Sequence, residues 1–329
     1  MERVVSQSNQ CVGAAGRAFY AASMHFSLQL PTDRVEPADE FVSGPAIAEL
    51  AQAIEGAGFD ACFVTEHPFP TDRWLSSGGH HALDPYVALS FAAAATRRLR
   101  VQTNIAVLAY RNPFLTAKAV ASLDVLSGGR VILGVAAGYL RGEFEALGVP
   151  FDERNERIDE ALVALRRAWS EDGIAFEGRH FRATGNTMRP RPQQRPHPPI
   201  WVGGNSRRAI RRAVEHGDGW IPFPTVGIAS DRVRTAPIES LADLAERLAY
   251  AREYAEQVGR SAPLEICFVP FGLSMHSRRG VDPLRFRDTV AELAALGVTW
   301  LTLGLPGDTR REFCDAVSRF GDEVLAALA

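Results

Sequence analysis

Short apolar segments alternate with longer amphipathic segments eight times along this sequence of 329 residues. The apolar segments are typical of buried strands, and the longer ones repeat with the period of about 3.6 residues that indicates helices. The expected strands are residues 25–30, 59–65, 99–108, 130–136, 199–204, 219–223, 264–269 and 299–304. The expected helices are residues 45–58, 84–98, 112–127, 152–169, 206–217, 239–258, 283–296 and 309–328.

This alternation predicts an α/β fold in which every strand pairs in parallel with its neighbours. Strands that are separated by helices require right-handed crossover connections. Eight such units fit a closed (β/α)8 barrel, the TIM barrel, better than an open sheet. No Gly-x-Gly-x-x-Gly follows the first expected strand, which counts against a dinucleotide-binding fold.

Two parts of the chain depart from the alternation. Residues 171–198 contain two short strand-like pieces, IAFEG and RHFRA, and then the Pro/Arg-rich run MRPRPQQRPHPP. Because the alternation resumes afterwards, we expect an insertion within one barrel domain of residues 24–329. Residues 1–23 have neither a strand nor a helix period, so we expect a poorly ordered leader, with Met24 as an alternative start.

Composition limits the classes of function. The net charge of −3 counts against a nucleic-acid binder that relies on a basic surface. The sequence has no apolar run of the ~18 residues that a transmembrane helix needs, and residues 1–23 lack the apolar core of a signal peptide. Cys62 and Cys267 lie in apolar segments, where free cysteine acts as a buried hydrophobe. We therefore expect a cytoplasmic protein that binds neither nucleic acid nor a membrane.

The active site of such a barrel lies at the carboxyl ends of the strands. The residues expected there are mostly apolar, and only Glu66-His67 adds neighbouring ionisable groups. A metal site needs several His, Asp, Glu or Cys ligands in these positions, so we predict none. A pocket with apolar walls, glycine turns and one histidine suits a flat aromatic cofactor.

Three places at these strand ends are candidates for chemistry. The turn 203–206, Gly-Gly-Asn-Ser, follows an apolar strand and opens a helix, so its N–H groups could bind a phosphate. A plain tight turn is the alternative. Asn104 is a polar amide within an apolar strand and must find partners, whether from a ligand or from the protein. His67 is either a proton-transfer group or a surface loop residue.

Several longer stretches together resemble the bacterial luciferase-like superfamily of flavin- and deazaflavin-dependent oxidoreductases, over essentially all of residues 24–329. These stretches are GFDACFVTEHP, YRNPFLTAKAVASLDVLSGGRVILGVAAGYLRGEFEALGVPFDER, RPQQRPHPPIWVGGNS and AVEHGDGW. The long second stretch, taken with PPIWVGGNS and GDGW, is highly specific. The resemblance implies a (β/α)8 barrel with insertions that binds coenzyme F420, or alternatively FMN, across the carboxyl ends of its strands.

The resemblance also implies roles for individual residues. His67 matches the catalytic histidine that acts near the flavin ring as proton donor, acceptor or orienting group. Asn104-Ile105 matches the place where many members have a non-prolyl cis peptide bond, and the turn 203–206 matches the phosphate-binding turn. The expected cofactor contacts are Thr103, Asn104, Ile105, Ala106, Gly138, Tyr139, Gly203, Gly204, Asn205 and Ser206.

One departure from the family pattern concerns the substrate. Some members that oxidise sugar phosphates carry Glu directly after the glycine of the GVAAG-like turn, where this chain has Tyr139. Glu143 could replace it, but we expect an exposed glutamate on a helix surface. Arg189, Arg191 and Arg195 could receive the oligoglutamate tail of F420, or could belong to an ordinary Arg-rich linker.

The function that we expect is hydride transfer between F420 and a small organic substrate, with His67 serving the proton step. The alternatives are a two-component FMN-dependent monooxygenase and a non-catalytic flavin-binding protein. A separate flavin or F420 reductase is a candidate partner. Luciferase-like proteins commonly dimerise through the region of helices 84–98 and 112–127, which are rich in small apolar residues, so we expect a homodimer.

Overall fold

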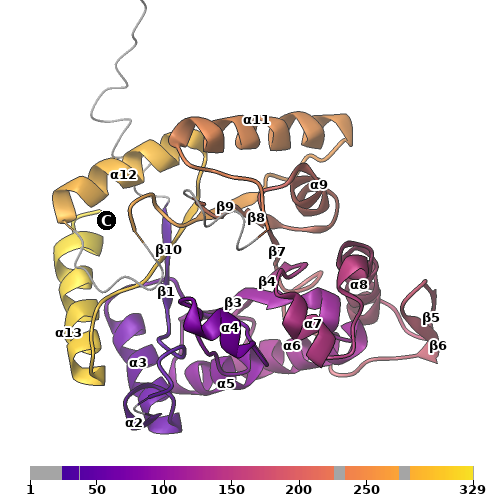
Figure 1. Ribbon diagram of the computed structural model, residues 1–329, viewed down its shortest axis with the longest axis horizontal. Helices are drawn as coiled ribbons and strands as arrows, with labels where there is room; N and C mark the ends of the chain where they lie inside the picture. Colours follow the sequence, from indigo (N-terminus) through magenta and orange to yellow (C-terminus); the bar gives the residue numbers. More distant parts are fainter. Residues whose placement is uncertain (1–23, 37, 226–233, 274–281, 329) are drawn as a thin grey trace, which may run out of the picture.

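The computed structural model describes residues 24–36, 38–225, 234–273 and 282–328, and the leader expected at residues 1–23 lies outside these. Its centre is a closed barrel in which eight strands follow the order β1-β10-β9-β8-β7-β4-β3-β2, so the predicted (β/α)8 barrel is confirmed (Figure 1). All the pairings are parallel. The barrel strands are β1 (His25–Gln29), β2 (Ala61–Val64), β3 (Arg100–Val107), β4 (Val131–Ala136), β7 (Ile200–Gly203), β8 (Gly219–Ile221), β9 (Glu265–Phe268) and β10 (Trp300–Leu303).

Long helices surround the barrel (Figure 1). Their bounds are close to the predicted ones. They are α3 (Gly44–Gly56), α5 (Pro85–Ala95), α6 (Pro113–Ser127), α8 (Arg154–Ser170), α9 (Arg207–His216), α11 (Leu241–Gln257), α12 (Pro283–Leu296) and α13 (Arg310–Phe320). The last one is shorter than predicted, because the chain continues beyond Phe320 as the π-helical turn η3 (Gly321–Leu325). A Cβ atom at Gly321 would lie 2.6 Å from the carbonyl oxygen of Ala57, so this turn packs directly on the backbone after α3.

Three of these helices begin with the same sequence signal. Asp84, Asn112 and Asp282 are N-caps whose side chains accept hydrogen bonds from backbone N–H groups of the first turn, and proline follows each of them. Such caps satisfy N–H groups that have no partner within the helix, and proline at the first position loses nothing there. The helix starts could therefore be predicted to within a residue.

Among the residues that the structure describes, five short elements in the connections were not predicted. They are α2 (Ala38–Phe41), α4 (Asp72–Ser76), η1 (Leu108–Tyr110), α7 (Arg141–Ala146) and η2 (Phe151–Glu153). Elements this short span one or two turns, so they show no recognisable hydrophobic period in the sequence. Two of them, α4 and α7, contribute to the site described below.

The insertion after α8 forms an antiparallel hairpin of β5 (Ile174–Glu177) and β6 (Arg182–Asn186), which projects beside α8 (Figure 1). The first predicted strand-like piece, IAFEG, coincides with β5, whereas β6 begins three residues later than the second predicted piece, RHFRA. The Pro/Arg-rich run then passes the amino end of β4, where the side-chain amide of Gln194 donates to Asp124 and to the carbonyl of Val131. That the whole chain from residue 24 is one domain stays a prediction.

Apolar side chains form two cores. The larger lies between the strands and the surrounding helices, and the smaller fills the barrel interior with Ala61, Ile132, Trp201, Ile221, Cys267 and Trp300. Burial raises the thiol pKa of Cys62, in the outer core, and of Cys267, in the inner one, to about 12, as expected for cysteines that act as hydrophobes. Within the described part of the chain, no helix has the length and apolar character needed to span a membrane.

Candidate active site

A cavity of about 340 Å³ lies at the carboxyl ends of β2, β3, β4, β7 and β8, which are neighbours in the barrel. Its size is within the range of small-molecule sites. Apolar side chains from three of these strand ends, those of β3, β4 and β8, line it, among them Ile105, Val107, Ala137 and Ile221. A second cavity, of about 610 Å³, adjoins the ends of β1 and β10, but none of the predicted site residues lines it.

Most of the predicted site residues line the smaller cavity. They are His67, Asn104, Ile105, Gly138, Tyr139, Gly203, Gly204 and Ser206. Thr103, Ala106 and Asn205 lie behind this wall. The Thr103 hydroxyl donates to the carbonyl of Gly134 at 2.7 Å, and Ala106 is fully buried. The roles assigned to all these residues stay predictions.

Asn205 ties two strand ends together. Its side-chain amide donates to the carbonyls of Phe223 (2.7 Å) and Ala236 (2.8 Å), and its side-chain oxygen accepts from the N–H of Phe223 (2.9 Å). Its polar atoms are therefore used to hold the connection after β8 against the turn after β7. Asn205 shapes the cavity from behind.

The pairing of β3 with β4 changes register where β3 reaches the cavity. The register shifts between Thr103 and Ala106, and the Asn104–Ile105 peptide bond within this interval is cis, at the place that the resemblance implied. Both residues line the cavity. A Cβ atom at Gly134 would lie 2.1 Å from the carbonyl oxygen of Thr103, so only glycine lets the two backbones approach this closely.

His67, directly after β2, is held on several sides. Its Nδ1 atom lies 3.4 Å from Oε2 of Glu143. The ring of Trp74, from α4, packs at 4.5 Å between centroids, and that of His80 packs edge-on at 4.8 Å. The side chain is 8% exposed, so His67 is part of the buried cavity wall and the alternative of a surface loop residue is wrong.

The expectation that Glu143 lies on an exposed helix surface is also wrong. The residue is 2% exposed, because α7 turns this face toward the barrel. Its Oε1 atom is buried and has no hydrogen-bond partner among the described residues. Leaving a buried polar atom unpaired costs about 1–3 kcal/mol, so Glu143 is a candidate functional residue. Its place in the long family-like stretch was the one signal in the sequence that could have found it.

Two tyrosines lie close to this pair. The ring of Tyr139 is 6.1 Å from that of His67, between centroids. The Tyr110 hydroxyl is buried without a hydrogen-bond partner in the described structure. Burial raises the pKa of both phenols above the usual range, reinforced at Tyr110 by the charges of Glu66 and Glu143 and at Tyr139 by that of Glu143. Both are therefore neutral at physiological pH.

Glu66 connects the end of β2 to the end of β3. Its carboxylate accepts from the backbone N–H of Val107 and from Nε of Arg111, both at 2.6 Å, and Arg111 also pairs with Asp84 at 2.9 Å. Burial raises the pKa of Glu66, and the positive charge of Arg111 opposes this effect. The Glu66 carboxylate is thus used in contacts that hold the cavity wall. The neighbouring His67 is the ionisable group that is available for chemistry.

The turn after β7 forms another part of the cavity wall. Ser206 caps α9, with its hydroxyl oxygen accepting from the N–H of Ala209. Gly204 has a φ of +115°, and a Cβ atom there would lie 3.1 Å from that of Ala209. This geometry favours glycine and leaves the backbone of the turn open to the cavity. The positive end of the α9 dipole lies at the same place.

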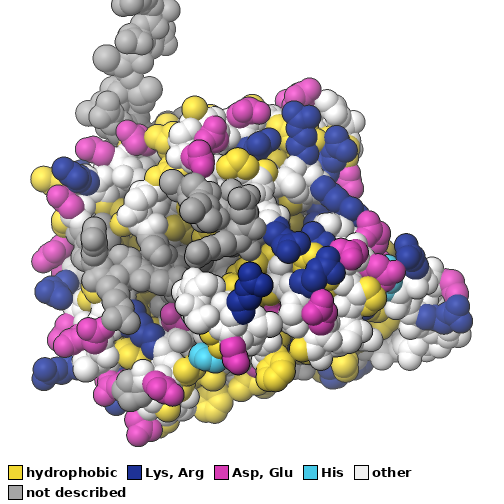
Figure 2. Space-filling view, in the orientation of Figure 1, with side chains coloured by type: hydrophobic (Ala, Val, Ile, Leu, Met, Phe, Trp, Pro, Cys, Tyr) yellow, Lys and Arg dark blue, Asp and Glu magenta, His cyan; other side chains and the backbone are white. Residues whose placement is uncertain are grey.

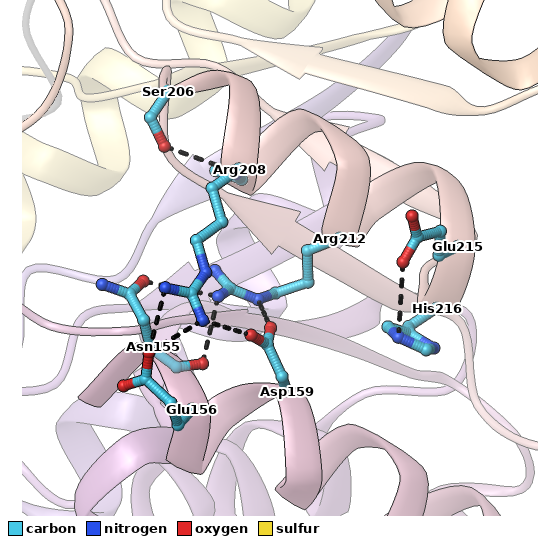
Figure 3. A network of polar contacts seen from close by, with 9 residues as sticks. Asn155, Glu156, Asp159, Ser206, Arg208, Arg212, Glu215 and His216 are labelled. Atoms are coloured by element: carbon cyan, nitrogen blue, oxygen red, sulfur yellow. Dashed lines mark hydrogen bonds and ion pairs between the residues drawn. The ribbon is translucent and has the colours of Figure 1, made fainter. Parts of the chain in front are cut away.

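Arginines strengthen the positive charge at this turn. Figure 3 shows Arg208 and Arg212 reaching from α9 to α8, where both pair with Asp159. Arg212 is 4% exposed and lines the cavity, as does Arg154 at the start of α8. A helix amino end beside two arginines is an arrangement that can bind a phosphate group.

Arg189, Arg191 and Arg195 lie elsewhere. Arg189 and Arg191 both pair with Asp172, at 2.7 and 2.8 Å, and these bonds lower the Asp172 pKa to about 2. The run that contains them passes the amino end of β4, whereas the cavity lies at the carboxyl ends. None of these arginines lines the cavity, so a tail-binding role for them is not supported by their position.

Comparisons with known proteins agree with this geometry. The model of the luciferase-like monooxygenase family matches residues 24–276. An F420-dependent glucose-6-phosphate dehydrogenase of Intrasporangium calvum is 30% identical over 77% of this chain and 80% of its own. An FMNH2-dependent dimethylsulfone monooxygenase of Pseudomonas putida is 37% identical, but over 52% of this chain, and the chain spans only 46% of that relative's length.

Solved structures share the fold. An F420-dependent tetrahydromethanopterin reductase from Methanopyrus kandleri superposes with a TM-score of 0.70 at 18% identity, covering 93% of this chain and 99% of that one. A monooxygenase from Streptomyces bottropensis gives a TM-score of 0.69 at 23% identity, covering 93% of this chain and 100% of that one.

The Glu66 cross-link yields a prediction about stability. Glu66→Ala leaves the Val107 N–H and the Arg111 guanidinium without their buried acceptor, so the free energy of unfolding should fall by about 3–5 kcal/mol. Glu66→Gln keeps an acceptor for Val107 and should lose less. Urea denaturation measures both. Asp152→Ala is the control, because it removes an exposed ion pair with Arg141 and should cost under about 1 kcal/mol. A loss for Glu66→Ala no larger than that of the control would contradict this role.

Proposed function

Because the chain belongs to the luciferase-like monooxygenase family, we propose that it is an oxidoreductase that transfers a hydride between coenzyme F420 and a small organic substrate. The observation that carries the proposal is that one apolar cavity brings together the buried His67–Glu143 pair and a glycine turn beside two arginines. The cofactor supplies the hydride chemistry when it is bound. The protein has to hold its ring, bind its phosphate and manage a proton.

The residues of the cavity fit a flavin-like group. Ile105, Val107 and Ala137 offer an apolar wall for a flat ring. The backbone at Gly204 and the side chain of Arg154 would hold the phosphate, because N–H groups at a helix start and a guanidinium both favour an anion. These contacts would fix the ring relative to His67, and fixed geometry is a large part of what an enzyme contributes to a transfer step.

His67 would handle the proton. A hydrogen bond from its Nδ1–H to Oε2 of Glu143 selects the neutral tautomer in which Nε2 carries no proton. Nε2 is then the atom that accepts a proton from a substrate hydroxyl, or returns one in the reverse reaction. Glu143 acts through His67 and is in our proposal a positioning residue.

A second candidate is an FMN-dependent monooxygenase that uses reduced FMN and oxygen, with a separate reductase as partner. The identity to the FMNH2-dependent enzyme of Pseudomonas putida favours it. Both cofactors carry a ribityl phosphate, so the same turn serves either. Equilibrium titration of the purified protein with F420, FMN and reduced FMN tests the choice. Tighter binding of F420, and its absorbance change during a substrate screen, supports our proposal, whereas tight binding of reduced FMN alone overturns it.

The proton step yields a kinetic prediction. His67→Ala should lower turnover by about 10²–10⁴-fold, the typical contribution of one proton-transfer group, while the cofactor dissociation constant changes little. Glu143→Gln should lower turnover by a smaller factor, because the amide does not enforce the same tautomer. Steady-state kinetics and cofactor titration measure both quantities.

A double-mutant cycle separates positioning from a general structural effect. If Glu143 acts through His67, Glu143→Gln should have almost no further effect on turnover in the His67→Ala protein. Independent, multiplicative losses would show that the two residues act separately. Unchanged turnover in His67→Ala would remove the histidine from the mechanism.

The turn after β7 yields a prediction on cofactor binding. Gly204→Asp should weaken F420 by about 10–100-fold, equivalent to the roughly 1.5–3 kcal/mol of one charged hydrogen bond, because its carboxylate repels the phosphate. Gly204→Ala controls for the strain at a φ of +115°, and should lose less affinity. Fluorescence titration measures both. Equal affinity in the parent and the two variants would mean that the phosphate binds elsewhere.

We also propose that the protein is a homodimer that associates through α5 and α6, which pack side by side. Their outer faces expose large apolar side chains: Val87 (58%), Phe91 (51%), Leu115 (73%) and Leu126 (81%). Figure 2 shows hydrophobic side chains along the edge where α5 lies in Figure 1. A cluster of this kind on a folded protein is typical of an interaction surface.

Light scattering tests the dimer. The parent protein should have the mass of two chains at micromolar concentration, and the double variant Phe91→Asp/Leu115→Asp the mass of one, because buried unpaired carboxylates oppose association. Leu284→Asp is the matched control, since Leu284 is 73% exposed but lies on α12. A parent protein with the mass of one chain, or a control that dissociates equally, contradicts the proposed interface.

A further inference from the structure

We infer that a second anion-binding site adjoins the cofactor cavity, and that it binds the oligoglutamate tail of F420. The site consists of Arg141, Arg154 and Arg234, which surround the ring of Phe151, together with Arg73 across a neighbouring cavity. This inference rests on the proposed function, because it concerns a part of the same cofactor.

Three guanidinium groups converge on one aromatic ring. The Cζ atoms of Arg141, Arg154 and Arg234 lie 4.4, 4.0 and 5.1 Å from the centroid of Phe151. Phe151 is 4% exposed and packs edge-on against Phe144 at 5.2 Å. A fixed ring of this kind attracts cations to its face, so it holds the three arginines near one another.

A separate cavity continues from the cofactor cavity toward these arginines. It has a volume of about 340 Å³, and Arg73, Arg141 and Arg234 are among its lining residues. Tyr139 and Arg234 line both cavities. A ligand whose phosphate lies at the turn after β7 can therefore extend past Tyr139 without leaving a surface lined with arginines.

The positive charge of this site is only partly balanced within the described structure, because the single carboxylate of Asp152 acts on all three arginines around Phe151. Arg141 pairs with Asp152 at 2.8 Å, but that carboxylate is 78% exposed. The nearby Glu156 pairs with Arg208. No ion pair among the described residues joins Arg73, Arg154 or Arg234 to a carboxylate. Burial lowers the pKa of Arg154, the like charge of Arg234 lowers it further, and the charge of Asp152 opposes these effects. Figure 2 shows Lys and Arg side chains gathered beside α7 and α8.

A chain of carboxylates matches this arrangement better than a second phosphate would. The four arginines come from α4, α7, α8 and the connection between β8 and α11, so they are spread over the rim. Each guanidinium can bind a carboxylate through two parallel hydrogen bonds, and a flexible tail can present several carboxylates at once. FMN ends at its phosphate and leaves Arg73, Arg141 and Arg234 without a ligand.

Binding measurements with two forms of F420 test the site. The probes are F420 with a tail of several glutamates and F420-0, which has the same ring and phosphate without glutamates, titrated by deazaflavin fluorescence at low and high salt. The parent protein should prefer the tailed form by about tenfold at low salt, and the preference should shrink at high salt, where exposed charges are screened. Arg141→Gln and Arg234→Gln should each reduce it by about two- to fivefold, the range of a single exposed ion pair.

Arg189→Gln is the matched control. Arg189 also forms an exposed pair with an aspartate, at 2.7 Å, but lies outside both cavities, so its variant should keep the full preference. Equal affinity of the parent for the two forms overturns the tail site and leaves the proposed function standing. Failure of both forms to bind overturns the proposed function itself. A loss in Arg189→Gln as large as in Arg141→Gln would show only a general effect of net charge, and would overturn the site.

Discussion

The closure of the parallel barrel is the constraint on which the rest of the structure depends. Parallel strands that close into a ring place all their carboxyl ends on one face. In this chain the ring brings together residues that are far apart in the sequence, among them His67, Asn104 and Gly204. Closure also fills the barrel interior with its own apolar core, so the walls of the cavity are the strand ends and the connections that follow them.

Some of the buried polar side chains near the cavity have all their hydrogen-bond partners in the protein, and others do not. Glu66 and Asn205 use their polar atoms on the backbone of neighbouring strand ends, and so stabilise the shape of the cavity. Glu143 and Tyr110 each keep a buried polar atom without a partner in the described structure. Burial of an unpaired polar atom opposes folding, and such atoms also occur far from the cavity, for example at His180 and Arg247. Glu143 is the one that contacts His67, which connects its cost in stability to the proposed chemistry.

Much of the fold could be predicted from the sequence, and less of the site. Hydrophobic periods and Asp-Pro or Asn-Pro caps locate the long helices closely, because these signals are local. The candidates Asn104 and Gly204 were predicted from a polar amide in an apolar strand and a glycine turn before a helix, and the resemblance added Ile105. Glu143 was misjudged because α7 is a single short helix, and its buried face depends on which element it packs against. The arginines around Phe151 were missed for a related reason, since the segment after β4 supplies Arg141 and Arg154, and the connection after β8 supplies Arg234.

The sequence by itself determined the number and order of the strands and helices, and with them the (β/α)8 class, because apolar periodicity and capping are properties of short segments. It also determined that the turn after β7 and the end of β2 carry polar groups. Only the tertiary structure decided which ionisable groups meet. In the tertiary structure Glu143 is buried against His67, and Glu66 accepts hydrogen bonds from Val107 and Arg111. Arg141, Arg154 and Arg234 lie around one aromatic ring. These pairings depend on how the connections fold over the rim of the barrel, and no local pattern records that.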